Sequence, residues 1–200
     1  VRHFIEPSRL IAGVKAVYGE AEYEAKDAPI VPIDAARIRA VADNETLEFG
    51  ARALTFMHTR GHANHHICIH DSKSNGVFTG DSFGVEYNSG RVTKRPFLMC
   101  SSAPTDFDPD AARDSIRRIV GTGAERVFVA HYGELTDVRG GAEVMLESID
   151  RMERVLKDAT DSALDGDALQ QFCEEGVRKA FEEQIAACGV VLEETAWQTI

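Results

Sequence analysis

Apolar residues recur at helical spacing near the start of the chain. Between Pro7 and Gly19 they return every three or four positions, as on one face of a helix. A glycine such as Gly19 is typical of a helix end. The segment therefore predicts a short helix with an apolar face made of Leu10, Ile11, Val14, Val17 and Tyr18.

Extended patterns follow in pairs. The run ETLEFGARALTFMH, residues 45–58, contains two strand-like segments that meet at Gly50, which predicts a hairpin. Next, HHICIHD at residues 65–71 and VFTG at residues 77–80 are separated by SKSNG, a typical turn sequence. We therefore expect two more strands joined by this turn.

The next two segments predict a helix and then a strand. In FDPDAARDSIRRIVGTG, Asp108 takes the N-cap position, Pro109 the first helical position and Gly121 the end. The run RVFVA, residues 126–130, predicts a buried strand that ends at His131. Strands in pairs with helices between them predict an α/β layered domain.

From Gly140 onward the chain predicts two long amphipathic helices with residues 163–166 as the linker. We expect residues 140–200 to be a helical extension. It would pack on an α/β domain of residues 1–139, or on a partner subunit in a homo-oligomer. The apolar stripes comprise Met145, Ile149, Met152 and Leu156 in the first helix and Leu169, Phe172, Cys173, Phe181 and Ile185 in the second.

Composition and charge narrow the function classes. The chain has 200 residues, 44% of them hydrophobic, which is enough for one sizeable core. Its formal net charge of −11, without a block of Lys or Arg, disfavours nucleic acid as a partner. No apolar run approaches the roughly 18 residues of a membrane span, so we expect no membrane partner. Four cysteines without CxxC spacing indicate reduced thiols in a cytoplasmic protein.

Histidines are concentrated in HTRGHANHH, residues 58–66, which holds four of the seven in the chain. A solvated polar loop is one interpretation, and a metal site is the other, because histidine is the commonest metal ligand. Three residues share a position after a predicted strand: His62, Asp81 and His131. Strand ends are where α/β proteins assemble sites, and two imidazoles with a carboxylate suit zinc or non-haem iron. We therefore predict that these three side chains converge at one edge of the sheet.

The neighbouring aromatic residues are weaker candidates. Neighbours in an extended segment point to opposite faces, so at most one of His65 and His66 can face the site. His66 shares parity with His62, and metal-bound imidazoles usually need such an orienting partner. His58 is more typical of a structural strand-end residue than of a ligand. Tyr132 is a candidate for substrate contact, with a packed tyrosine as the alternative.

Three short motifs resemble a known family. The GH of HTRGH, the GD of FTGD and AHYG are similar to the third, fourth and fifth metal-binding motifs of the metallo-β-lactamase-fold hydrolases, over Leu47–Glu134. The resemblance implies an αβ/βα sandwich, of which residues 1–139 are the C-terminal portion. It also implies two metals at one edge between two sheets. His62 would bind the first metal, Asp81 would bridge both, and His131 would bind the second.

The resemblance also implies a cofactor and a branch of the family. Zinc is the expected metal, with two ions in an intact site, and iron or manganese are the alternatives. Gly80 and Gly84, on either side of Asp81, would let the backbone approach closely. The HTxGHxxHH pattern and the trailing helices resemble the glyoxalase-II-type hydrolases.

One departure from the family is clear. Its HxHxDH motif, which supplies most of the ligands and comes earlier in the sequence, does not occur in these 200 residues. Because the chain also begins with Val1 rather than methionine, we expect it to be the C-terminal part of a longer enzyme. The missing N-terminal half would then be a partner for this part. We expect the 200 residues alone to hold metal weakly or not at all, and to be inactive.

The expected function is hydrolysis of an ester, thioester or lactone of a small acid by metal-bound hydroxide. The substrate would be a small molecule. An iron-dependent sulfur dioxygenase, which resembles glyoxalase II but uses one iron, is the first alternative. A non-catalytic module that packs against a partner through its amphipathic helices is the second.

Overall fold

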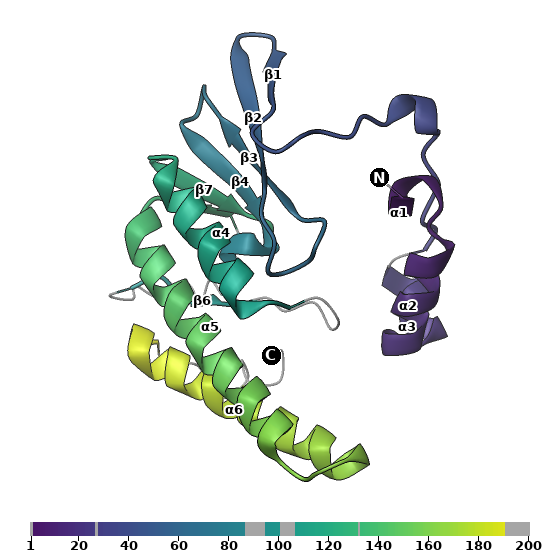
Figure 1. Ribbon diagram of the computed structural model, residues 1–200, viewed down its shortest axis with the longest axis vertical. Coiled ribbons are helices and arrows are strands. Elements are labelled where there is room, and N and C mark those ends of the chain that lie inside the picture. The colour runs from purple at the N-terminus through teal and green to yellow at the C-terminus, as the bar shows by residue number, and fades with distance from the viewer. Residues whose placement is uncertain (1, 27, 87–94, 101–106, 132, 191–200) are drawn as a thin grey trace. The chain divides into compact units, whose positions relative to one another are not determined.

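The computed structural model describes residues 2–26, 28–86, 95–100, 107–131 and 133–190. It divides the chain into two compact units, Val1–Ala42 and Asp43–Ile200 (Figure 1). The first unit is helical and the second is α/β. The boundary between these two units differs from the domain boundary that we expected at Gly140. The domain boundary at Gly140 stays a prediction.

The described part of the first unit contains the short α-helices α1 (Arg2–Ile5), α2 (Ser8–Tyr18) and α3 (Glu20–Lys26), followed by the 3₁₀ helix η1 (Ala35–Arg37). The predicted helix is confirmed as α2, and it ends at Gly19, whose φ of 88° suits glycine. Helix α3 was not predicted, because EAEYEAK has a single large apolar residue, Tyr23. That side chain is buried, and the Lys15 ammonium lies 4.6 Å from its ring centroid.

The second unit is built on a six-stranded mixed sheet in the order β1-β2-β3-β4-β7-β8. All neighbouring strands are antiparallel except β4 and β7, which are parallel. Both predicted hairpins are confirmed, with turns at Gly50 and at residues 72–75. The strands are β1 (Thr46–Phe49), β2 (Arg52–His58), β3 (Ile67–Asp71), β4 (Gly76–Gly80), β7 (Arg126–Val129) and β8 (Gly133–Leu135).

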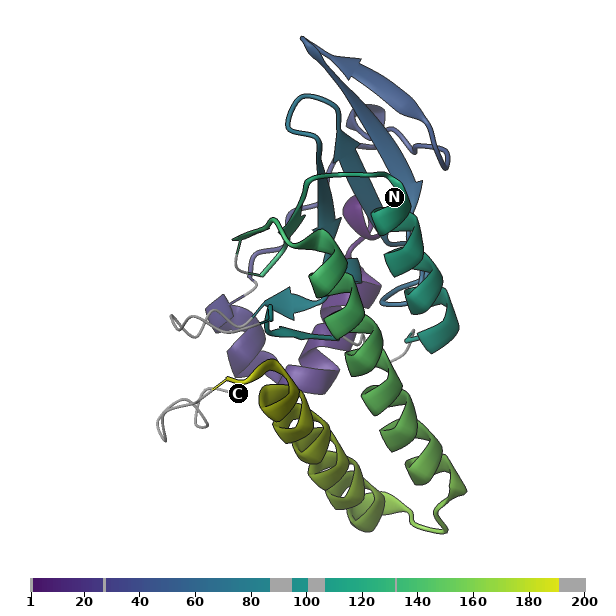
Figure 2. The ribbon, with the colours of Figure 1, turned by 90° about the vertical axis from the view of Figure 1, so that its left-hand side faces the viewer.

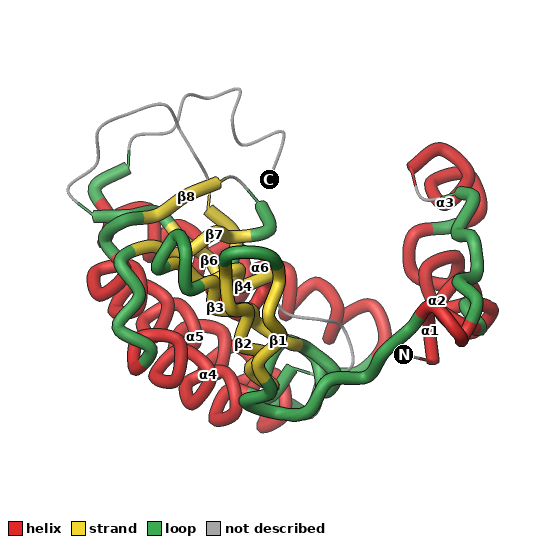
Figure 3. The backbone as a smooth tube through the Cα atoms, turned by 90° about the horizontal axis from the view of Figure 1, so that it is seen from above, coloured by secondary structure: helices red, strands yellow, loops and turns green. Residues whose placement is uncertain are grey.

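Helix α4 (Pro109–Gly121) lies between β4 and β7 in sequence and packs on the sheet (Figure 3). Its predicted start is confirmed, because the Asp108 carboxylate accepts a hydrogen bond from the Ala111 amide at 3.0 Å. A short 3₁₀ turn, η2 (Asp81–Phe83), and a two-stranded sheet of β5 (Val85–Glu86) and β6 (Leu98–Met99) follow β4. The predicted α/β class is therefore confirmed.

The core lies between one face of the sheet and the helices α4 and α5 (Val138–Asp161). Val127 and Val129 of β7 are buried there, whereas Phe128 points to the opposite face and is only partly buried. Phe128 stacks on Phe78 of β4, with ring centroids 4.7 Å apart. The prediction of a wholly buried β7 is therefore wrong in one respect, since α4 and α5 cover only one face.

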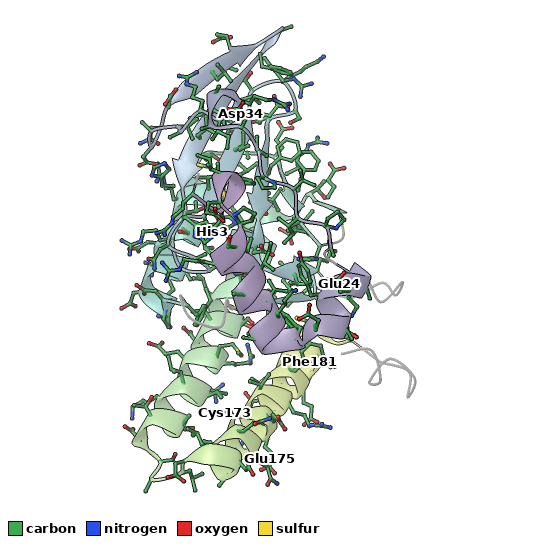
Figure 4. The ribbon with its side chains drawn as sticks, turned by 90° about the vertical axis from the view of Figure 1, so that its right-hand side faces the viewer. His3, Glu24, Asp34, Cys173, Glu175 and Phe181 are labelled. Atoms are coloured by element: carbon green, nitrogen blue, oxygen red, sulfur yellow. The ribbon has the colours of Figure 1, made fainter. Side chains whose placement is uncertain are left out.

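The two C-terminal helices are confirmed as α5 and α6 (Gly166–Cys188), a pair joined by residues 162–165 (Figure 2). In α5, Met145 and Ile149 are buried, but Leu156 is 51% exposed because that end of the helix extends past the sheet. In α6, Phe181, which is labelled in Figure 4, is buried. Its ring packs edge-on against Phe97, with centroids 5.5 Å apart. Among the residues that the structure describes, no helix has the length and apolarity needed to cross a membrane.

Candidate metal centre

The loop between β2 and β3, residues 59–66, carries His62 and is fixed against α4. The Ser115 hydroxyl of α4 donates a hydrogen bond to the Arg60 carbonyl at 2.6 Å. Gly61 has a φ of 121°, and a Cβ there would collide with the backbone of Ala112. Because the loop touches the helix backbone at this glycine, the position of His62 is set by a rigid neighbour.

Asp81 begins the turn that follows β4. Gly80, with a φ of 49°, makes the backbone bend there, and a Cβ on it would lie 2.5 Å from Nε2 of His66. Gly84 ends the turn with a φ of 77°, packed against Met145 and the Met99 carbonyl. The predicted close approaches at Gly80 and Gly84 are therefore confirmed.

His131 follows β7, the parallel neighbour of β4. Gly80 pairs with Val129 across these strands, and the Ala130 amide donates to the Gly80 carbonyl at 3.3 Å. Parallel neighbours end at the same edge of a sheet, so the residues that follow them, Asp81 and His131, meet there.

The three predicted side chains do converge. Nε2 of His62 lies 3.6 Å from Oδ2 of Asp81, and Nε2 of His131 lies 3.3 Å from Oδ1 of the same carboxylate. Each carboxylate oxygen thus faces a different imidazole. Their side chains are 20%, 27% and 56% exposed for His62, Asp81 and His131, so the cluster is open to small molecules. The role of these residues as metal ligands stays a prediction.

The spacing fits metal ligands, but the set is incomplete. Two ligands of one tetrahedral zinc ion, each at about 2.0–2.2 Å, lie about 3.4 Å apart. Both imidazole–carboxylate distances are close to this value. However, each pair offers only two donors, and no group of three or more His, Cys, Asp or Glu side chains in the described part of the chain could hold an ion.

His66 lies next to the cluster and is tied to it. Its Nε2 lies 3.1 Å from the Asp81 amide nitrogen, and its Nδ1 lies 2.9 Å from the hydroxyls of Thr59 and Ser82. Burial lowers the pKa of His66, and the neighbouring His62 lowers it further. These contacts tie His66 to the turn that carries Asp81, and its role as an orienting partner of a metal ligand stays a prediction.

The other candidates lie elsewhere. His58 ends β2 with an exposed side chain; its amide donates to Oδ1 of Asp43 at 2.8 Å, and its carbonyl accepts from Arg118 at 3.0 Å. Its placement is therefore that of a strand-end residue. His65 is also exposed. Tyr132 lies outside the described residues.

Several residues of the site were not predicted. Arg60 lines a small recess together with His62 and Asp81, and its guanidinium donates to the neutral amide oxygen of Asn64 at 2.7 Å. The other walls of the recess include Phe107, Ala112, Met145 and Ile149. The contact of Arg60 with Asn64 lies within a loop, and the pairing of Thr59 and Ser82 with His66 is tertiary, so neither is visible in the local sequence pattern.

A buried thiol lies beneath this network. Sγ of Cys68 lies 3.2 Å from the Thr59 hydroxyl and donates to the Thr79 carbonyl at 3.3 Å. Burial raises the pKa of the Cys68 thiol to about 11. All four cysteines are free, as predicted.

Fold and site together define an α/β protein with a His/Asp/His cluster at the ends of sheet strands. The family model described as the metallo-beta-lactamase superfamily matches residues 5–131, more than half of the chain. The chain therefore belongs to the metallo-β-lactamase superfamily, whose members are generally metal-dependent hydrolases. This confirms the family that the motifs predicted, while the glyoxalase-II branch stays a prediction.

Solved structures share the fold. An archaeal metallo-beta-lactamase superfamily protein from Sulfolobus tokodaii is 20% identical with a TM-score of 0.56, covering 88% of this chain and 63% of its own. A metallo-beta-lactamase family protein from Thermus thermophilus is 22% identical with a TM-score of 0.56, covering 92% and 60%. A beta-lactamase domain protein from Burkholderia ambifaria is 17% identical with a TM-score of 0.52, covering 89% and 53%. The chain thus spans less than two thirds of the length of these structures.

Proposed function

We propose that this chain is part of a metal-dependent hydrolase that cleaves an ester, thioester or lactone of a small acid. The observation that carries the proposal is the Asp81 carboxylate, with one oxygen 3.6 Å from His62 and the other 3.3 Å from His131. When bound, zinc, or alternatively iron or manganese, would polarise the substrate carbonyl and lower the pKa of water so that hydroxide attacks at neutral pH.

The chain's own residues would hold the metal and orient the substrate. Asp81 holds its two oxygens toward two imidazoles on different loops, which fixes the spacing of the donors. Arg60 places a positive charge at the recess that His62 and Asp81 line, where it would attract the carboxylate of an acidic substrate.

The proposal includes ligands beyond the described residues. A working zinc site usually has about three protein ligands for each ion and an open position for water. His62, Asp81 and His131 are too few for two ions. We therefore propose that an N-terminal half of the same protein, bearing the HxHxDH motif, supplies the rest.

The test compares metal content and turnover of a thioester and lactone panel. The proteins are the 200-residue chain, the full-length protein, and full-length Asp81→Ala. Full-length Asp114→Ala is the control, because that carboxylate lies exposed on α4. Tight metal and turnover are expected only for the full-length protein and its control.

Other results would contradict parts of the proposal. Stoichiometric metal and full turnover in the 200-residue chain would mean that residues such as His58 or His65 complete the site. Oxygen consumption with a persulfide, without hydrolysis, would identify a sulfur dioxygenase instead. A full-length protein that holds no metal and turns over nothing would favour a non-catalytic module.

A further inference from the structure

We propose that His66 is a positioning residue of this centre, fixed in the tautomer that carries its proton on Nδ1. In this form it holds the Asp81 backbone with its Nε2 lone pair and is thereby excluded from binding metal itself. The inference rests on the proposed function only in taking Asp81 as a ligand.

The direction of one hydrogen bond sets the tautomer. A backbone amide can only donate, so the 3.1 Å contact between the Asp81 amide and Nε2 of His66 requires a lone pair on Nε2. A neutral imidazole with a free Nε2 carries its proton on Nδ1. That proton has acceptors at hand, because the hydroxyl oxygens of Thr59 and Ser82 each lie 2.9 Å from Nδ1.

The Thr59 and Ser82 hydroxyls can accept a hydrogen bond from Nδ1 of His66 because each has another partner for its own proton. Ser82 donates to the Thr59 carbonyl at 3.4 Å. The Thr59 hydroxyl also contacts Sγ of Cys68 at 3.2 Å. Thr59 is fully buried and Ser82 is 7% exposed, so water does not readily replace these partners. The network favours one orientation of the His66 ring.

The hydrogen bond between His66 and the Asp81 amide sets the distance between the loop that carries His62 and the turn that carries Asp81. His66 belongs to the loop that carries His62, and its Nε2 holds the first amide of the turn that carries Asp81. It therefore couples the position of one proposed ligand to that of the other. Gly80 permits this contact, since a Cβ there would lie 2.5 Å from Nε2. Mutation of a residue that positions a metal ligand without binding the metal typically lowers metal affinity by about 10–100-fold.

The first test reads the tautomer directly in the metal-free 200-residue chain. Long-range ¹H–¹⁵N correlation spectra of the histidine rings, assigned with His66→Gln, should show His66 protonated on Nδ1 and unprotonated on Nε2. In the full-length protein, addition of Zn²⁺ to saturation should shift the rings of His62 and His131, and Nε2 of His66 should keep its metal-free signature. A proton on Nε2, or Zn²⁺ bound there, would overturn the proposal.

The second test separates positioning from general structural support. His66→Gln keeps an acceptor for the Asp81 amide, whereas His66→Phe keeps the ring volume without one. In the full-length protein, we expect His66→Phe to weaken Zn²⁺ binding about 10-fold or more and to shift the Asp81 amide resonance, with His66→Gln closer to wild type. The control is His70→Phe in the following strand, β3, where Nε2 lies 3.5 Å from Asn75. Equal Zn²⁺ affinity in wild type and both His66 variants would reject the proposal.

These readouts are independent of hydrolysis. If His66 carries its proton on Nδ1 but the full-length protein turns over no substrate, the proposed function is rejected and the positioning role stands. If the protein turns over substrate and Zn²⁺ is bound to His66, the proposed function stands and the positioning role is rejected.

Discussion

Nε2 of His131 lies 3.3 Å from Oδ1 of Asp81, although helix α4 and the strands β5, β6 and β7 lie between the two residues in sequence. The parallel pairing of β4 and β7 causes this proximity, because both strands end at the same edge. The cluster is therefore a property of the sheet, and the substitutions that test it can leave the core untouched.

Removal of individual donors should have unequal effects. Asp81 faces both imidazoles, whereas His62 and His131 each face one carboxylate oxygen. We therefore expect Asp81→Ala to weaken Zn²⁺ binding more than His62→Ala or His131→Ala, each of which should cost about 10-fold or more. Titration with a competing chelator measures this in the full-length protein. Equal losses for all three variants would contradict the bridging arrangement.

Gly80→Ala should destabilise the fold and disturb His66. The new Cβ would lie 2.5 Å from Nε2 of His66, at a residue whose φ is 49°. Strain of this kind costs about 1–3 kcal/mol of unfolding free energy, which urea denaturation can measure.

Gly121→Ala is the matched control for that substitution. Gly121 is the last residue of α4, and a Cβ there would meet nothing within 4 Å. We expect its free energy of unfolding to stay within about 0.5 kcal/mol of wild type. A loss at Gly121 equal to that at Gly80 would show that the His66 contact is not the cause.

Local signals in the sequence predicted much of the fold and the core of the site. Asp108 and Pro109 marked the start of α4, and strand-end placement brought His62, Asp81 and His131 together. Periodicity identified apolar stripes but not what covers them. Ile149 of α5 is 1% exposed and belongs to the core cluster, whereas Phe172 of α6 lies outside that cluster and is only partly buried.

The difference between Ile149 and Phe172 predicts a difference in stability. Ile149→Asp should cost several kcal/mol, because it places an unpaired carboxylate in the core. Phe172→Asp, at the outer part of the α5–α6 pair, should cost clearly less. Leu156→Asp is the control, since that side chain is 51% exposed. Thermal denaturation measures the loss of stability in each variant. If Phe172→Asp loses as much stability as Ile149→Asp, a partner subunit covers α6.

Arg60→Gln should change substrate preference rather than the fold. The guanidinium is exposed at the recess and contacts a neutral amide, so its loss breaks no ion pair with a described residue. In the full-length protein we expect KM for a thioester with a carboxylate group to rise about 10-fold, and KM for its neutral methyl ester analogue to stay constant. Equal changes for both substrates would show that Arg60 does not recognise the acid.

The stability of the α/β unit should depend on alkaline pH through Cys68. Burial raises the pKa of this thiol from its ordinary value of 9.0 to about 11, so the folded state favours the neutral form. The unfolded chain releases this proton at a lower pH than the folded chain. The thiol therefore contributes its full stabilisation below about pH 9, and that contribution is lost as the pH rises toward 11, by about 2–3 kcal/mol in total. Urea denaturation between pH 8 and 11 measures the slope, and the difference between wild type and Cys68→Ser isolates this thiol from other titrating groups. Identical slopes in the two proteins would mean that the Cys68 thiol ionises in the folded state as easily as in the unfolded chain.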